Sequence, residues 1–279
     1  MKRAAVVIAV LGMCLAVCGQ DNNKPTGAAG PANATQGKRP PQAKTKPEYD
    51  AFNAAMALTD PAAVEKAADD FATKFPSSEL QVMLYKSAME KYERANNADK
   101  MLEMARKALT LDPDDPVALV ETARVLAQRT RDTDLDKDER RAEAKKNAER
   151  ALVTVDTDVP TTGVPQERLD QFKGYVRSEA YATLGTLASK ANNWPEAESY
   201  LRKSIDAFPQ EMDSVAVLML AIALDKQDKY PEALKYANQA VDLTKDHADS
   251  EAGKAAREEQ DRLTQLNKGS APGQAAPKK

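Results

Sequence analysis

Cysteine, histidine and glycine are scarce in this sequence, and their scarcity excludes several classes of chemistry. The only two cysteines, Cys14 and Cys18, lie near the N-terminus, and His247 is the only histidine. A disulfide framework, a Cys–His catalytic pair and a zinc site of cysteine and histidine are therefore excluded from the rest of the chain. The sequence also lacks a glycine-rich phosphate loop and a nucleophile elbow. We therefore expect neither an enzyme nor a cofactor.

A surplus of positive charge is also missing. The formal net charge is −3, and lysine and arginine alternate with aspartate and glutamate along the chain without forming a basic stripe. Nucleic-acid binding depends on such a stripe, so no nucleic-acid partner is expected.

The abundant residues are alanine, leucine, lysine, glutamate and arginine, whereas aromatic residues make up only 5% of the chain. These abundant residues lose little side-chain freedom in a helix and are the stronger helix formers. The composition therefore predicts an all-α protein.

The N-terminus has the form of a secretory signal peptide, which we place at residues 1–18. Met1-Lys2-Arg3 is followed by an apolar run, Ala4–Cys18, without ionisable groups other than thiols. This run is shorter than the roughly 20 residues that a membrane-spanning helix needs. The sequence thus predicts export, with an uncleaved anchor as the alternative.

Leu15-Ala16-Val17-Cys18 resembles the lipobox of bacterial lipoproteins, although Val17 stands where glycine, alanine or serine is usual. The resemblance implies lipidation of Cys18 and membrane association through that lipid. The alternative is ordinary cleavage near Gly19 or Gln20. Either route predicts an exported protein, periplasmic or held at the outer membrane as a lipoprotein.

Residues 19–46 are rich in proline, glycine, alanine, asparagine and lysine and have almost no large apolar side chain. Such a segment buries too little surface to offset its ordering entropy, so we expect a disordered tether. Residues 267–279 predict a second disordered tail for the same reason.

The middle of the chain contains a repeat. Trp194-Pro195-Glu196-Ala197 recurs 36 residues later as Tyr230-Pro231-Glu232-Ala233. Self-similarity at such a period is typical of helical repeat proteins. An aromatic residue, a proline and a small residue in this order predict the turn and second helix of a helical hairpin.

The residues before Trp194 fit the first helix of the same hairpin. Tyr181, Leu184-Gly185 and Ala188 have helical spacing, and the small residues Gly185 and Ala197 would let two helices approach closely. Pro209 follows the second helix, where a residue without an N–H ends it. A similar pattern surrounds Met101, and a weaker one surrounds Phe52.

Together these motifs resemble the tetratricopeptide repeat family. The resemblance implies an all-α, tetratricopeptide-type solenoid of about five helical hairpins with a C-terminal capping helix, over residues 47–266. We expect the hairpins at about 47–76, 80–113, 116–153, 167–209 and 213–244, and the cap at 248–266. Val153–Arg168, which contains Pro160, Gly163 and Pro165, predicts an irregular excursion.

This resemblance also implies a function. We expect a non-enzymatic scaffold for protein–protein interaction, or an assembly factor, in the bacterial cell envelope. Its partner would be a protein or peptide bound on the face of the first helices, at Lys86, Glu90, Arg124, Thr186, Leu218 and Ile222. These residues do not reproduce the lysine–asparagine clamp with which some family members bind a C-terminal carboxylate. A self-associating structural solenoid is an alternative.

One acidic segment suggests a further alternative. Asp132, Asp134, Asp136 and Glu143 occupy the first, third, fifth and twelfth places of an EF-hand-like loop, where oxygen ligands surround calcium. Lys137 replaces the glycine of the sharp turn in such loops. The segment is therefore also interpreted as an acidic turn whose Asp138 and Glu139 favour the start of the next helix.

Overall fold

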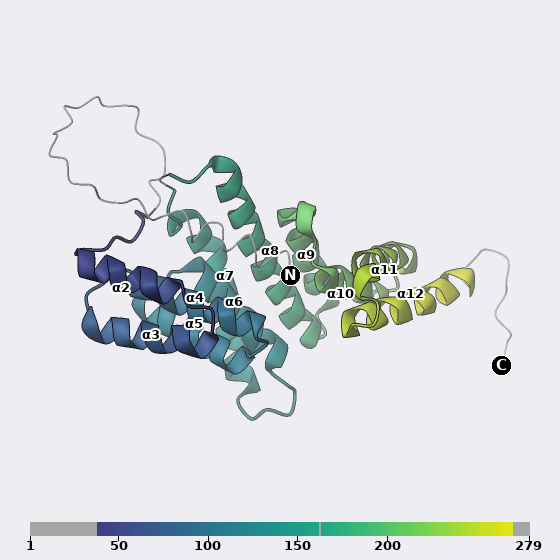
Figure 1. Ribbon diagram of the computed structural model, residues 1–279. Helices are drawn as coiled ribbons and strands as arrows, with labels where there is room; N and C mark the ends of the chain where they lie inside the picture. The colour runs from purple at the N-terminus through teal and green to yellow at the C-terminus, as the bar shows by residue number, and fades with distance from the viewer. Residues whose placement is uncertain (1–37, 162, 270–279) are drawn as a thin grey trace. The chain divides into compact units, whose positions relative to one another are not determined.

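The computed structural model describes residues 38–161 and 163–269, which contain eleven α-helices and no strand (Figure 1). The helices are α2 (Lys46–Met56), α3 (Pro61–Lys74), α4 (Gln81–Arg94), α5 (Ala98–Leu111), α6 (Pro116–Arg129), α7 (Lys137–Thr157), α8 (Gln166–Lys190), α9 (Trp194–Ala207), α10 (Ser214–Asp225), α11 (Tyr230–Thr244) and α12 (Glu251–Gly269). Two 3₁₀ helices, η1 (Pro209–Glu211) and η2 (Lys245–His247), precede α10 and α12. The expected signal peptide, Cys18 and the last ten residues lie outside the described part.

The chain divides into two compact units. The described residues of the first unit are 38–125, 149–161 and 163–176, and those of the second are 126–148 and 177–269. Across the described ranges, no helix has the length and apolar character needed to cross a membrane.

In the first unit, neighbouring helices pack in chain order, with α2 against α3, α3 against α4 and α4 against α5. Apolar residues at helical spacing form the core between them. Phe52 of α2 meets Phe71 of α3 edge to face, with ring centroids 6.4 Å apart, and Val64 is fully buried beside them. The first hairpin, which has the weakest repeat pattern, is thus closed by aromatic packing.

In the second unit, α9, α10, α11 and α12 also pack in order. Leu201, Leu220 and Leu224 are fully buried in one cluster with Leu263 of α12. Because Leu263 completes this cluster, α12 covers apolar surface that α10 and α11 would otherwise expose. The structure confirms the predicted all-α fold of helical hairpins with a capping helix.

The same turn joins the two helices of three hairpins. Its middle residue has a positive φ: 55° at Asn96, 56° at Asn192 and 59° at Asp228. The next amide then donates to the carbonyl oxygen five residues earlier, from Asn97 to Tyr92 at 2.9 Å, Asn193 to Ala188 at 2.9 Å and Lys229 to Leu224 at 3.0 Å. This Schellman pairing satisfies carbonyl groups that a helix end leaves free, and asparagine and aspartate tolerate the left-handed conformation it requires.

Gly185 marks a close approach between α8 and α9. A Cβ atom at this position would lie 2.7 Å from Cγ of Leu201 and 2.8 Å from its Cδ2. The absence of a side chain therefore makes room for Leu201, as the small-residue pattern predicted.

The excursion expected over 153–168 is shorter in the structure. Helix α7 continues to Thr157 and α8 begins at Gln166. Val155 is fully buried and Val159 nearly so, and their burial stabilises the additional turn of α7 and the start of the link. Gly163, with φ of 80°, lies in the link that remains.

Candidate peptide-binding site

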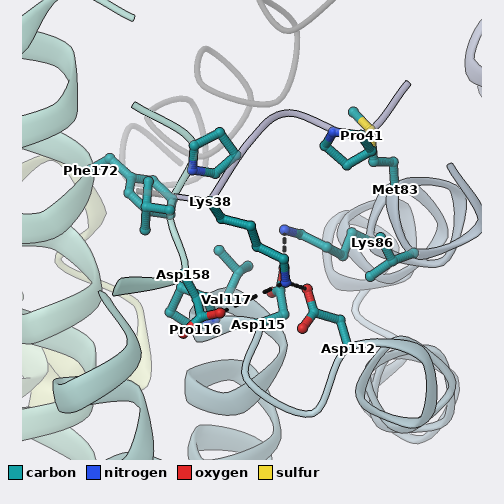
Figure 2. Close-up of a pocket in the computed structure, with 13 residues that line it drawn as sticks. Lys38, Pro41, Met83, Lys86, Asp112, Asp115, Pro116, Val117, Asp158 and Phe172 are labelled. Atoms are coloured by element: carbon teal, nitrogen blue, oxygen red, sulfur yellow. Dashed lines mark hydrogen bonds and ion pairs between the residues drawn. The ribbon is translucent and has the colours of Figure 1, made fainter. Parts of the chain in front are cut away.

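The first unit contains a pocket of about 70 Å³. Three aspartates and two lysines meet apolar walls there, and the pocket is lined by Lys38, Pro41, Val82, Met83, Lys86, Asp112, Asp115, Pro116, Val117, Asp158, Val159, Pro160 and Phe172 (Figure 2). These residues come from the segment before α2, from α4, from the turn between α5 and α6 with the start of α6, and from the link between α7 and α8 with the first turns of α8.

An ion pair inside the unit forms one wall of this pocket. One carboxylate oxygen of Asp115 accepts a hydrogen bond from the amide of Ala118 at 2.9 Å, as at a helix N-terminus, and Pro116 begins α6. Its other oxygen lies 2.5 Å from Nζ of Lys86 on α4. Both side chains are nearly buried, at 11% and 9% exposure. Lys86 thus stabilises the interior of the unit through this ion pair and also lines the pocket.

Lys38 enters the pocket from the other side (Figure 2). Its Nζ lies 2.5 Å from a carboxylate oxygen of Asp112 and 3.8 Å from one of Asp158. Lys38 is itself one of the residues that line the pocket, and its charge lies near these two carboxylates.

The residues after Lys38 also contact the first unit. Arg39 forms an ion pair with Glu79, and its hydrogen bond lowers the pKa of that carboxyl group. Nζ of Lys44 donates to the carbonyl oxygen of Ser77 at 2.7 Å, and its amide donates to Glu48 at 2.7 Å. The end of the expected disordered tether, residues 38–44, is therefore held against the unit in the structure.

Farther along α4 and α6 lies a group of glutamates, which we call the carboxylate cluster: Glu90 and Glu93 on α4 and Glu121 on α6. Arg124 lies 2.5 Å from a carboxylate oxygen of Glu93 and 2.5 Å from one of Glu121. The hydroxyl of Tyr175 donates to Glu121 at 3.1 Å. One arginine is thus shared by two carboxylates.

Burial makes negative charge costly in this cluster. The pKa of Glu93 is raised to about 7, first by burial and then by the neighbouring Glu121, with Arg124 opposing the shift. Burial also raises the pKa of Glu90, although Arg94 pairs with it at 2.5 Å. An additional cation near Glu93 would therefore be electrostatically favourable.

Helix geometry places the pocket and the cluster in one row. Lys86, Glu90 and Glu93 are separated by four and three residues on α4, and Val117, Glu121 and Arg124 have the same spacing on α6. Residues at these spacings share one side of a helix. The row therefore runs from the pocket to the carboxylate cluster, along α4 and α6, which are the first helices of two hairpins.

The raised pKa of Glu93 predicts a pH dependence of stability. Folded Glu93 keeps its proton up to about pH 7, whereas the unfolded residue loses it near 4.5. Its stabilising contribution is therefore complete below about pH 4.5 and is lost as the pH rises through 7. The side chain is 33% exposed, so we expect an effect of only about 1 kcal/mol.

The variant Glu93→Gln tests this effect in urea titrations at pH 5 and pH 8. Relative to the wild type, it should gain about 1 kcal/mol in free energy of unfolding between the two pH values. The exposed Glu258→Gln should show no such change. An equal pH dependence of stability in the wild type and in Glu93→Gln would contradict the assignment.

The predicted binding residues are divided between the units. Lys86, Glu90 and Arg124 lie in the row described above, but each is held by an ion pair within the first unit. In the second unit, Thr186 donates to the carbonyl oxygen of Ala182, Leu218 is 6% exposed in a core cluster, and Ile222 packs against that cluster. Partner binding by these residues stays a prediction. Sequence reasoning missed Glu93, Glu121 and the aspartates around Lys38.

The carboxylates of the calcium alternative have other partners. Asp132 pairs with Arg141 at 2.6 Å and Asp136 with Arg140 at 2.7 Å, while Asp134 accepts a hydrogen bond from the amide of Arg131. The described residues include no group of three or more acidic, histidine or cysteine side chains arranged to hold a metal ion. Calcium binding at Asp132, Asp134, Asp136 and Glu143 stays a prediction, and so does the interpretation of the segment as an acidic turn.

No family model and no curated protein matches the sequence. Among solved structures, the chain is similar to YrrB, described as a TPR protein with an unusual peptide-binding site, with 18% identity, 73% of this chain and 87% of that chain covered, and a TM-score of 0.45. It is also similar to PilF of Pseudomonas aeruginosa, with 17% identity, 82% and 96% covered, and a TM-score of 0.47. A third is PilW, described as a type IV pilus biogenesis factor, with 18% identity, 76% and 99% covered, and a TM-score of 0.39. Likenesses of this strength assign neither a family nor a function to this chain.

Proposed function

We propose that this chain is a non-enzymatic protein-interaction scaffold or assembly factor of the bacterial cell envelope, which binds a basic segment of a partner protein along α4 and α6. The carboxylate cluster carries this proposal. Glu93 and Glu121, on neighbouring first helices, share a single arginine and lie on the side of the helices that also lines the pocket. A lysine or arginine of a partner would supply the additional positive charge.

The expected contribution of such a contact follows from its surroundings. Charged pairs at the exposed rim of an interface affect mainly the rate of association, whereas partly desolvated pairs affect the affinity. Glu93 is two-thirds buried even without a partner. A cation of the partner that binds beside Glu93 is therefore expected to affect the affinity.

The second unit has an apolar surface of its own on α10. Val215, at the start of α10, is 44% exposed, and Met219 and Ile222 follow it at helical spacing with partial exposure. We place Thr186 at the edge of this surface, because its hydroxyl contacts the sulfur of Met219. Leu218 supports the surface from beneath, since it is almost fully buried.

The envelope location is the part of the proposal that rests on the N-terminal sequence. We propose that residues 1–18 direct export and that a lipid on Cys18 holds the protein at a membrane. This placement would present the helical repeats to partners within the envelope. Mass spectrometry of the N-terminal peptide tests it, because a lipid-bearing Cys18 and an unmodified start at Gly19 or Gln20 differ in mass.

Affinity capture from the native envelope tests the binding site. A full-length variant with Glu90→Gln and Glu93→Gln should retain about one-tenth or less of the partner captured by the wild type, since two desolvated charge contacts are weakened. A variant with Glu258→Gln and Asp261→Asn carries the same charge change at exposed positions of α12 and should capture normally. Equal capture by both variants, with helicity unchanged in circular dichroism, would rule out the carboxylate cluster as the site.

A further inference from the structure

We propose that Lys38–Lys44 is an intramolecular ligand of the first unit, in which Lys38 and Pro41 line the pocket, and that the partner's binding segment shares its chemistry: extended, basic and containing proline. This inference rests on the proposed function and specifies both the partner and its competitor. It assigns to residues 38–44 the role of occupying the site until a partner displaces them.

The contacts of the segment resemble those of a bound peptide. Each of its three cationic side chains reaches a group elsewhere in the first unit: Lys38 reaches Asp112 and Asp158, Arg39 reaches Glu79, and Lys44 reaches the carbonyl oxygen of Ser77. These partners follow the segment by 33 to 120 residues in the sequence. The segment is therefore held by tertiary contacts, which carboxylates and a carbonyl group of distant residues provide.

The composition of the segment also suits a peptide ligand. Residues 38–43 are not helical, and Pro40 and Pro41 are half-buried against the unit. Prolines restrict the backbone and extend the residue that precedes them. A chain already restricted to an extended form loses less entropy on binding, which is why proline-rich segments recur as ligands.

The nearly buried ion pair beneath the segment does not depend on it. Asp115 and Lys86, which form the nearly buried ion pair of the pocket wall, satisfy each other. By contrast, the side chains of Lys38 and Arg39 are 40% and 64% exposed, and ion pairs at such exposure contribute little, about 0–1 kcal/mol each. Departure of the segment therefore leaves the ion pair between Lys86 and Asp115 intact.

Competition sets the size of the expected effect. A ligand joined by a short linker has an effective concentration on the order of 1 mM. If its intrinsic Kd is about 100 µM, it weakens the binding of an external peptide about tenfold. Removing the cations of the segment should release this inhibition.

The test uses full-length protein and a fluorescein-labelled synthetic peptide with the sequence of residues 37–46, followed by fluorescence anisotropy. A variant with Lys38→Ala, Arg39→Ala and Lys44→Ala should bind this peptide about tenfold more tightly than the wild type does. Adding Asp112→Asn and Asp158→Asn to that variant should abolish the gain. Lys46→Ala is the matched control, because Lys46 pairs with Asp50 one turn along its own helix.

Two results would overturn the inference. One is equal peptide affinity in the wild type and the triple variant, which would show that the segment does not compete. The other is tight binding that persists after Asp112→Asn and Asp158→Asn, which would place the peptide elsewhere. If either occurs while the Glu90 and Glu93 variant still loses its partner, the inference fails and the proposed function stands. If the peptide competes as expected but capture is unaffected, the proposed function fails at the carboxylate cluster.

Discussion

Replacing Lys86 by methionine is expected to lower the free energy of unfolding of the first unit by about 3 kcal/mol. Methionine keeps most of the apolar stem but removes the cation 2.5 Å from Asp115. The carboxylate of Asp115 is nearly buried and would lose the cation that balances its charge, while keeping the hydrogen bond from the amide of Ala118. Breaking a buried pair from one side is costly because a desolvated charge remains.

Two controls separate this effect from general damage. Adding Asp115→Asn to Lys86→Met should recover about 2 kcal/mol, because asparagine also caps a helix N-terminus and carries no charge. Lys66→Met breaks an exposed pair with Asp70 and should cost less than about 0.5 kcal/mol. Urea titration by circular dichroism measures the loss, and hydrogen exchange of α4 and α6 assigns it to the first unit. A loss below that of Lys66→Met would refute the structural role of the pair.

The second large effect concerns the contact between Leu201 and Gly185. Leu201→Ala should lower the free energy of unfolding of the second unit by about 3 kcal/mol, because it leaves a cavity in a fully buried cluster. Gly185 has no side chain with which to fill that space. The effects of substitutions at Leu201 and Gly185 on the free energy of unfolding should therefore be strongly non-additive.

This coupling predicts a change of sign. In the wild type, Gly185→Ala places a methyl group 2.7 Å from Cγ of Leu201, and the resulting strain should exceed the roughly 1 kcal/mol that alanine gains in a helix. In the Leu201→Ala background the clash is gone, so the same change should stabilise by about 1 kcal/mol. Trp194, the only tryptophan, packs against this cluster and reports its unfolding by fluorescence. Equal effects of Gly185→Ala in the wild type and in Leu201→Ala would exclude the contact between position 185 and Leu201.

The hairpins were predictable because their determinants are local. Trp194 and Tyr230 begin α9 and α11, each followed by proline, as the repeated motif indicated. Gly185 lies opposite a large side chain, as its place in the motif predicted. The extra turn of α7 was missed because the burial of Val155 depends on tertiary packing, which overrides the local proline and glycine pattern.

The candidate site was less predictable because its pairs join distant parts of the chain. Composition alone favours disorder for residues 38–44, and nothing near Lys38 in the sequence identifies Asp112 or Asp158 as its partners. Glu93 and Glu121 have the pattern of ordinary solvated residues on helix surfaces. Only the packing of α4 and α6 brings both to Arg124.

The repeated turn has a consequence for how such a chain can change in length. Asn192 and Asp228 hold the same left-handed position 36 residues apart, and two residues after each of them begins a helix whose first residues are an aromatic residue and proline. A tandem duplication of residues 193–228 would join Asp228 to Asn193 and reproduce that turn at the new junction. The second unit can therefore lengthen by one helix pair through a single recombination event, without new turn chemistry.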